Sequence, residues 1–328
     1  MISERINLFR EGEYAYPDAY GFMPNMVSCI HDEDERIRPC LLVVPGGGYR
    51  VVSPTEGGIV AEKFYAKDYN AFVLTYTTNL LDKTPLRRQP LSEIARAVRL
   101  LRKHAAVYRI DGSRVITLGF SAGAHLCGSL GVHWDDVRDP DPELDAFSAR
   151  ADAMVLSYPV ITAGNEAHRD SFTALLGRNP ANEDLSYMSL EKHVTEKTPP
   201  CFLWQTVTDT TVPVTNSLIM AQALIDHHVR CALHLFSSGR HGLSLADAQW
   251  ASGEYGEPYT MEQTMHILSL VKNGTISLPE EMRESLLDRF DPENRAERSP
   301  LEPNREVSIW PDLADAWIRE VLGRCSDN

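Results

Sequence analysis

The sequence has few cysteines, no metal-binding motif and no long apolar run. Its six cysteines are scattered without a C-x-x-C pair, which predicts buried thiols rather than a disulfide framework or a zinc site. No H-E-x-x-H motif or other histidine–carboxylate cluster has metal spacing, so we expect neither a metal nor another cofactor. No apolar run is long enough to span a bilayer, which argues against a membrane partner.

Positive charge is also scarce, since 32 Lys and Arg residues face 46 Asp and Glu residues and the net charge is −14. An acidic surface without a basic stripe repels phosphate backbones, so nucleic acid is not an expected partner. The first 20 residues lack a basic region followed by an apolar run, so we expect no secretory signal and a cytoplasmic location. The 43% hydrophobic content is typical of a globular protein with a sizeable core.

The most informative stretch is 114–130, RVITLGFSAGAHLCGSL. An apolar, β-branched run leads into the turn Gly119-Phe120-Ser121-Ala122-Gly123, and a helix-compatible segment follows. A serine at the tip of such a strand–turn–helix unit is typical of a nucleophile elbow, in which small flanking residues let the chain fold back tightly. The alternative is a plain glycine-rich turn.

Short apolar runs alternate with amphipathic segments along the chain, which predicts a mostly parallel sheet with helices on both faces. Strands are expected at 22–30, 39–45, 70–76, 115–118, 153–160, 201–207 and 231–236, and helices at 57–67, 91–110, 216–226 and 309–322. We therefore predict a single α/β domain over residues 1–328.

Two segments interrupt this alternation. Residues 161–198 are polar and irregular, and we expect a cap over the active site, with a surface helix pair as the alternative. Residues 246–305 are rich in charged residues and proline, and we interpret them as a partly helical insertion. A lid, a dimer contact and an active-site wall all remain open for this insertion, so a homo-oligomer is also open.

A serine nucleophile needs an imidazole as general base and a carboxylate to orient that imidazole. After an elbow, the acid is expected behind a later strand and the histidine behind the last strand. Asp209 follows the run CFLWQTV, and His241 follows the run CALHLF between two glycines. Asp226 and Asp247 are the fallback acids, and His125, one turn after the serine, is more consistent with a structural role.

Three consecutive glycines, Gly46, Gly47 and Gly48, directly follow a predicted buried strand. No G-K-[ST] follows them, which weakens a phosphate-binding interpretation. We predict that an N–H group of this loop and the N–H of Ala122 form an oxyanion hole. A merely flexible turn is the alternative.

Four stretches in this order resemble the acetylxylan-esterase-like branch of the α/β-hydrolase fold. They are PGGGYRVVSPTEGG, GFSAGAHLCGSL, TPPCFLWQTVTDTTVPVTNSL and LFSSGRHGLSLAD, and IWPDLADAWI near the end extends the resemblance. The resemblance implies Ser121 as nucleophile, Asp209 as orienting acid and His241 as base. Pro45 before the glycines, where many lipases carry histidine, and Gln205, where relatives tend to have histidine, depart from the pattern.

The implied activity is a serine carboxylesterase that removes acetyl groups from xylo-oligosaccharides or other sugars through an acyl-enzyme. Tyr49, Trp204 and Gln205 are candidate pocket residues, the two aromatic rings for stacking on a sugar, although aromatic residues here are also typical of core packing. Two alternatives remain. The same triad could hydrolyse another ester, an amide, a peptide or a lactone, or the chain could be a binding protein with a silent triad.

Overall fold

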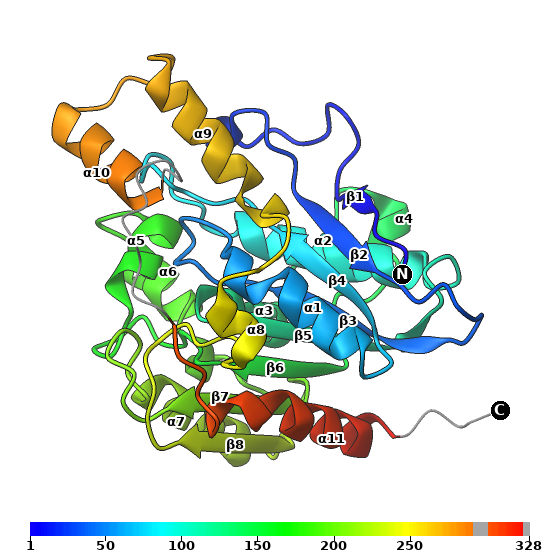
Figure 1. Ribbon diagram of the computed structural model, residues 1–328. Coiled ribbons are helices and arrows are strands. Elements are labelled where there is room, and N and C mark those ends of the chain that lie inside the picture. Colours follow the sequence, from blue (N-terminus) through cyan, green and yellow to red (C-terminus); the bar gives the residue numbers. More distant parts are fainter. Residues whose placement is uncertain (291–300, 324–328) are drawn as a thin grey trace.

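A mostly parallel sheet forms the centre of the molecule (Figure 1). The computed structural model describes residues 1–290 and 301–323. Within these residues, eight strands lie in the order β1-β2-β4-β3-β5-β6-β7-β8. Strands β3 to β8 are mutually parallel, whereas β1 and β2 add two antiparallel strands at one edge. The strands are β1 Arg5–Asn7, β2 Asn25–Cys29, β3 Arg38–Val44, β4 Asn70–Thr75, β5 Ile110–Phe120, β6 Ala153–Ser157, β7 Cys201–Thr206 and β8 Cys231–Phe236.

The predicted fold class is confirmed, and all seven predicted strands are present. Strand β1 was not predicted, because a run of three residues is too short for its polar–apolar alternation to indicate a strand. The helices are α1 Gly58–Tyr65, α2 Gln89–Lys103, α3 Ala122–His133, α4 Pro142–Asp145, α5 Arg169–Leu176, α6 Asn182–Tyr187, α7 Thr215–Asp226, α8 Ala248–Ser252, α9 Glu262–Lys272, α10 Glu280–Phe290 and α11 Trp310–Leu322.

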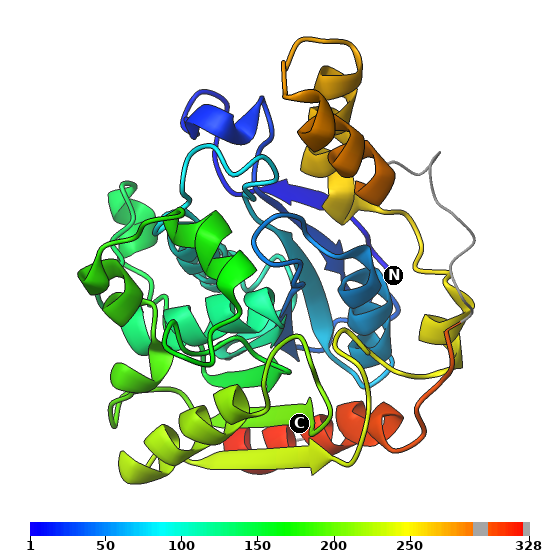
Figure 2. The ribbon, with the colours of Figure 1, turned by 90° about the vertical axis from the view of Figure 1, so that its left-hand side faces the viewer.

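Helices cover both faces of the sheet, because side chains alternate across each strand. In β3, Cys40, Leu42 and Val44 join the core beneath α2, α3 and α7. Leu41 and Val43 point the other way and join the core beneath α1 and α11. Helix α11 (red) accordingly runs beside β6 and β7 (Figures 1 and 2). Burial on both faces explains why these strands read as continuous apolar runs.

Each of the two irregular segments contains short helices. Helices α5 and α6 lie within 161–198, and α8, α9 and α10 lie within 246–305. Residues 291–300 of the predicted insertion lie outside the described residues. No helix in the described ranges has both the length and the apolarity needed to cross a membrane.

Part of the insertion docks on the loop after β4. Gln263 of α9 accepts hydrogen bonds from the N–H and O–H of Thr78, at 2.9 and 3.0 Å, and both residues are buried. A small apolar cluster of Leu80, Leu81, Ile267, Leu268, Val271, Ile276 and Leu286 completes this contact. Figures 1 and 2 show α9 and α10 as a hairpin at the outer edge of the molecule.

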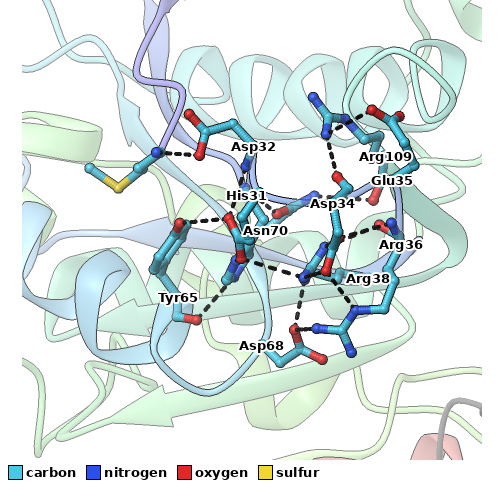
Figure 3. A network of polar contacts seen from close by, with 12 residues as sticks. His31, Asp32, Asp34, Glu35, Arg36, Arg38, Tyr65, Asp68, Asn70 and Arg109 are labelled. Carbon is cyan, nitrogen blue, oxygen red and sulfur yellow. Dashed lines mark hydrogen bonds and ion pairs between the residues drawn. The ribbon is translucent and has the colours of Figure 1, made fainter.

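The amino-terminal end of the sheet carries a dense network of charged side chains (Figure 3). The guanidinium of Arg38, at the start of β3, donates to Asp34 at 2.6 and 2.9 Å and to Asp68 at 2.7 Å. Asn70, at the start of β4, donates to the carbonyl groups of Tyr108 and Arg109 at 2.9 and 3.1 Å. These contacts join the loops that enter β3, β4 and β5.

Candidate active site

Ser121 lies on a sharp turn between β5 and α3. Its backbone is left-handed, with φ 51° and ψ −116°, a conformation that costs a non-glycine residue on the order of 1–3 kcal/mol. The turn is tight enough to require glycine on both sides, because a Cβ atom on Gly119 would overlap the carbonyl of Gly123. A Cβ on Gly123 would in turn overlap the carbonyl of Val44. The strand–turn–helix unit predicted from the sequence is therefore present, with the serine at its tip.

The structure brings Ser121, His241 and Asp209 into one chain of hydrogen bonds. The Nε2 atom of His241 lies 2.8 Å from the Oγ atom of Ser121, and its Nδ1 atom lies 2.7 Å from Oδ2 of Asp209. The serine and the aspartate are 6% and 7% exposed. This is the order and spacing that a nucleophile, a general base and an orienting acid require.

Backbone groups hold Asp209 in place. Its Oδ1 atom accepts hydrogen bonds from the N–H groups of Thr211 and Val212, at 2.9 and 3.0 Å. Burial raises the pKa of Asp209, but the hydrogen bond and charge of His241 and these two N–H groups outweigh burial. The pKa therefore lies below its ordinary value, and the carboxyl is ionised at neutral pH.

The competing residues take other roles. His125 is fully buried between the hydroxyl of Tyr49, 2.8 Å from its Nδ1, and the carbonyl of Met188, 3.0 Å from its Nε2. Burial lowers the pKa of His125 to about 4, so this histidine is neutral and structural. Asp226 is exposed at the end of α7, and Asp247 caps α8 by accepting the N–H of Trp250.

The glycine loop after β3 lies against the elbow, but its first N–H group is occupied. Gly46 donates to Oε2 of Glu56 at 2.7 Å, which corrects the expectation that Gly46 is available to an oxyanion. Gly47 and Gly48 follow with positive φ angles of 124° and 65°. Ala122 is the first residue of α3, so its N–H has no acceptor within the helix. Gly47, Gly48 and Ala122 thus remain the candidate oxyanion donors.

The three expected pocket residues are wrong as sugar contacts, because the structure buries them. Tyr49 is 1% exposed, and Trp204 and Gln205 are fully buried. Trp204 stacks on Trp310 at a centroid distance of 5.3 Å, which makes it part of the core. Gln205 donates to the carbonyl of Val212 at 2.7 Å and lies 3.4 Å from Asp209, so it supports the acid's loop.

Sequence reasoning missed three side chains beside the triad, namely Glu56, Tyr158 and His168. The ring of Tyr158 contacts the imidazole of His241 at a centroid distance of 4.9 Å, and its O–H donates to Glu56 at 2.6 Å. His168, from the segment predicted as a cap, lies close enough for the charge of His241 to affect its pKa, which burial lowers. An acidic residue inside the motif SPTEGG, shortly after the three glycines, was the one signal available.

Within residues 1–290 and 301–323, no group of three or more histidine, cysteine, aspartate or glutamate side chains is arranged to hold a metal ion.

A known protein family matches much of this chain. The family model BD-FAE matches residues 29–224, more than half of the chain. The chain belongs to the BD-FAE family. The matched region contains the glycine loop, Ser121 and Asp209 but stops before His241.

The chain is also similar to three proteins whose names describe a hydrolase activity. The chain is 50% identical over 261 residues to endo-1,4-β-xylanase B of Butyrivibrio fibrisolvens, across 80% of this chain and 41% of that protein. It is 29% identical over 205 residues to an acetylxylan esterase of Xylanibacter ruminicola, across 61% of this chain and 40% of that protein. The chain thus spans about two fifths of the length of these curated relatives.

The third similar protein has a crystal structure. An acetyl ester-xyloside bifunctional hydrolase from Caldicellulosiruptor lactoaceticus is 36% identical, with a TM-score of 0.70, and the match covers 84% of this chain and 97% of that one. A carboxylesterase from Lactobacillus plantarum, 24% identical with a TM-score of 0.60 over 85% of this chain and 100% of that one, supports the fold alone. The α/β-hydrolase fold expected from the sequence is therefore confirmed.

Proposed function

We propose that this chain is a serine carboxylesterase that removes acetyl groups from acetylated xylo-oligosaccharides. The observation that carries the proposal is the hydrogen-bond chain from Ser121 through His241 to Asp209, with 2.8 and 2.7 Å between successive partners. The names of the relatives supply the substrate class, since they include an acetylxylan esterase and an acetyl ester-xyloside hydrolase.

In the proposed reaction the Oγ atom of Ser121 attacks the acetyl carbonyl carbon while Nε2 of His241 takes the hydroxyl proton. The carbonyl π-bond opens to a tetrahedral oxyanion, which the N–H of Ala122 and an N–H of the Gly47–Gly48 loop stabilise. When the oxyanion collapses, the bond to the sugar oxygen breaks and His241 returns the proton to that oxygen. The products of this half are the sugar alcohol and acetyl-Ser121.

Water completes the cycle by the same steps. His241 takes a proton from the water, whose oxygen attacks the acetyl carbon, and the second oxyanion occupies the same donors. Collapse breaks the bond to the serine Oγ, which recovers its proton from His241, and acetate leaves. Asp209 holds the imidazole with Nδ1–H toward the carboxylate throughout, so that Nε2 can accept a proton.

One relative is named a xylanase, and the bifunctional hydrolase also acts on xylosides. Glycosidic bonds are normally cleaved between two carboxyl groups about 5–9 Å apart. The site proposed here is instead built on a serine and an imidazole, which favours ester hydrolysis.

We also propose a cytoplasmic location, supported by five described cysteines that are all free thiols.

The test compares the wild type with Ser121→Ala and with a control, Ser129→Ala, which removes a buried hydroxyl from α3, the helix that follows Ser121. Acetate and xylose are measured separately after incubation with acetylated xylo-oligosaccharides, and 4-nitrophenyl acetate serves as a simple ester. We expect acetate without xylose, a loss of about 10⁴-fold or more in Ser121→Ala, and near wild-type rates in the control. Undiminished acetate release by Ser121→Ala would contradict the proposal.

A further inference from the structure

A buried carboxyl group lies behind the triad without belonging to it. Glu56 ends a short 3₁₀ helix, Pro54–Glu56, between the glycine loop and α1, and it is 4% exposed. Its Oε2 atom accepts the N–H of Gly46 at 2.7 Å, and its Oε1 atom accepts the O–H of Tyr158 at 2.6 Å. Both carboxyl oxygens are thus engaged, one by the loop after β3 and one by the residue after β6.

Tyr158 extends this contact to the loop that carries His241. Its hydroxyl oxygen accepts the N–H of Ser244 at 3.1 Å, so its single proton is left for Glu56. Its ring packs edge-on against the imidazole of His241, with an interplanar angle of 69°. The backbone of Tyr158 is left-handed, with φ 37°, an unusual conformation for a bulky residue that only firm surrounding contacts maintain.

Two of the three loops that meet at Glu56 carry groups whose relative positions matter to the proposed esterase. The loop after β3 carries the candidate oxyanion donors Gly47 and Gly48, and the loop after β8 carries the base. Gly46 also touches the elbow, since a Cβ on this residue would overlap the carbonyl of Phe120 and crowd the side chain of Ser121. A shift of the Gly46 peptide therefore moves the donors relative to the nucleophile.

Burial of a carboxyl group is unfavourable in itself. Burial raises the pKa of Glu56, while the hydrogen bonds from Tyr158 and Gly46 and the charge of His241 oppose this rise. An apolar side chain would fill the same space without desolvating a carboxyl group. Glu56 lies between the glycine loop and the ring of Tyr158, which packs on His241. Its two hydrogen bonds therefore connect these two parts of the site.

We propose that Glu56 is a positioning residue which, through Gly46 and Tyr158, fixes the oxyanion loop and the His241 loop relative to Ser121. This inference rests on the proposed esterase function. Because the donors must be in place when the oxyanion forms, loss of this clamp is expected to slow turnover more than it weakens substrate binding.

A second buried glutamate provides a matched control. Glu93 in α2 is fully buried and accepts the N–H of Thr77 at 2.8 Å and the O–H of Tyr14 at 3.0 Å. Like Glu56, it accepts from a backbone N–H and a tyrosine hydroxyl, and it also accepts the O–H of Thr77 and the side-chain amide of Gln89. Glu93 contacts neither the glycine loop nor the ring beside His241, so its substitution reports the structural effect alone.

The experiment measures kcat and KM for 4-nitrophenyl acetate and the affinity for phenylboronic acid. Boronic acids form a tetrahedral adduct with a nucleophilic serine and so report the oxyanion site without turnover. The variants are Glu56→Gln, Tyr158→Phe, Glu93→Gln and Ser121→Ala. A glutamine at position 56 can accept only one of the two donors, and phenylalanine at position 158 keeps the ring but removes the O–H.

We expect Glu56→Gln to lower kcat about 10- to 100-fold, with KM changed by less than about threefold, because the effect falls on the transition state. Boronate affinity is expected to fall with kcat. Tyr158→Phe is expected to act in the same direction by about 3- to 10-fold, because its ring still supports the imidazole. Glu93→Gln is expected to lower the melting temperature and leave kcat within about twofold.

Equal kcat values for Glu56→Gln and Glu93→Gln, or a loss confined to KM, would overturn the positioning role. If Glu56→Gln does not fold, Tyr158→Phe decides the question, because it removes a single oxygen atom. If Ser121→Ala remains active, the esterase proposal itself fails, and this result is distinct from a failure of the Glu56 inference.

Discussion

Two polar networks lie at opposite ends of the same sheet, and they differ in how their groups are paired. At the amino-terminal end, the positive charge of Arg38 meets the negative charges of Asp34 and Asp68 directly (Figure 3). At the carboxyl-terminal end, a neutral hydroxyl, an imidazole and a carboxylate follow one another in a line. Fixed pairs of opposite charge hold loops together, whereas a hydroxyl next to an imidazole provides a path for a proton.

Backbone strain does not distinguish these two ends. Asp68 and Arg109 at the amino-terminal end have left-handed backbones, with φ 72° and 50°, as do Ser121 and Tyr158 at the other end. What differs between the two ends is the chemistry of the side chains that these strained residues carry. We therefore expect substitutions at the carboxyl-terminal end to change the rate and substitutions at the amino-terminal end to change stability.

The largest effect is expected for Asp209→Asn. An asparagine can still accept the backbone N–H groups of Thr211 and Val212, so the loop is expected to keep its shape. It no longer selects the tautomer of His241 with Nδ1–H, so kcat is expected to fall by about 10⁴-fold with little change in melting temperature. Asp226→Asn, which changes an exposed aspartate outside the site, is the control, and a similar loss in that variant would contradict the assignment.

His125 predicts a pH dependence of stability from a group next to the site but outside the triad. Its pKa is about 4 in the folded chain and 6.5 ordinarily, so between these values the unfolded chain binds a proton that the folded chain does not. Its contribution to stability is therefore lost as the pH falls from about 6.5 to about 4, by up to about 3 kcal/mol.

The measurement compares the free energy of unfolding of the wild type and of His125→Gln over this pH range. Glutamine can replace both hydrogen bonds, to Tyr49 and to Met188, without titrating. The variant is expected to lose less stability than the wild type as the pH falls. Parallel curves for the two proteins would show that His125 is not the buried neutral group described here.

Arg38→Met tests the other side of the comparison. The side chain of Arg38 is 1% exposed, and methionine fills its volume but removes the buried guanidinium that pairs with Asp34 and Asp68, which keep only the exposed Arg36 between them. We expect the free energy of unfolding to fall by about 2 kcal/mol, with kcat unchanged.

Arg36→Met is the matched control, because Arg36 contacts the same two aspartates from a side chain that is 60% exposed. Solvent screening makes such a pair weak, so we expect no measurable change in stability. A loss of kcat in Arg38→Met at unchanged stability would break the contrast between the two ends.

The smallest effect is expected for Gln263→Leu, at the contact between α9 and the loop after β4. This change leaves the N–H and O–H of Thr78 buried without their acceptor and is expected to cost about 1–2 kcal/mol. Hydrogen exchange is expected to increase in α9 and α10 before it increases in the sheet. Uniform loss of protection across the chain would show that the hairpin does not unfold separately.

Local signals in the sequence were sufficient to predict every strand of the described sheet except β1, and the order of the candidate triad. Apolar runs marked β2 to β8, and the small residues around Ser121 marked the elbow, because steric requirements there admit few side chains. Asp209 and His241 were found by their places behind strands. The single-domain organisation, the catalytic roles and any oligomeric state remain predictions.

Contacts between distant loops were not predictable in the same way. The bonds of Glu56 to Gly46 and Tyr158 span 10 and 102 residues, and no local pattern encodes such a meeting. The sequence also did not indicate that Trp204 belongs to the core. A tryptophan in a strand is compatible with core packing and with a substrate pocket, and the sequence alone does not distinguish the two. The sequence therefore indicated which residues follow which strands, but not which side chains take the space between them.

The most direct test of the account is covalent labelling with diethyl 4-nitrophenyl phosphate, followed by peptide mapping. A serine activated by His241 attacks the phosphorus, releases 4-nitrophenolate and keeps the diethylphosphoryl group. We predict one label per chain, on the peptide that contains Ser121, together with loss of esterase activity and no labelling of Ser121→Ala. A label on another residue, or an active enzyme that takes up no label, would contradict the central claim.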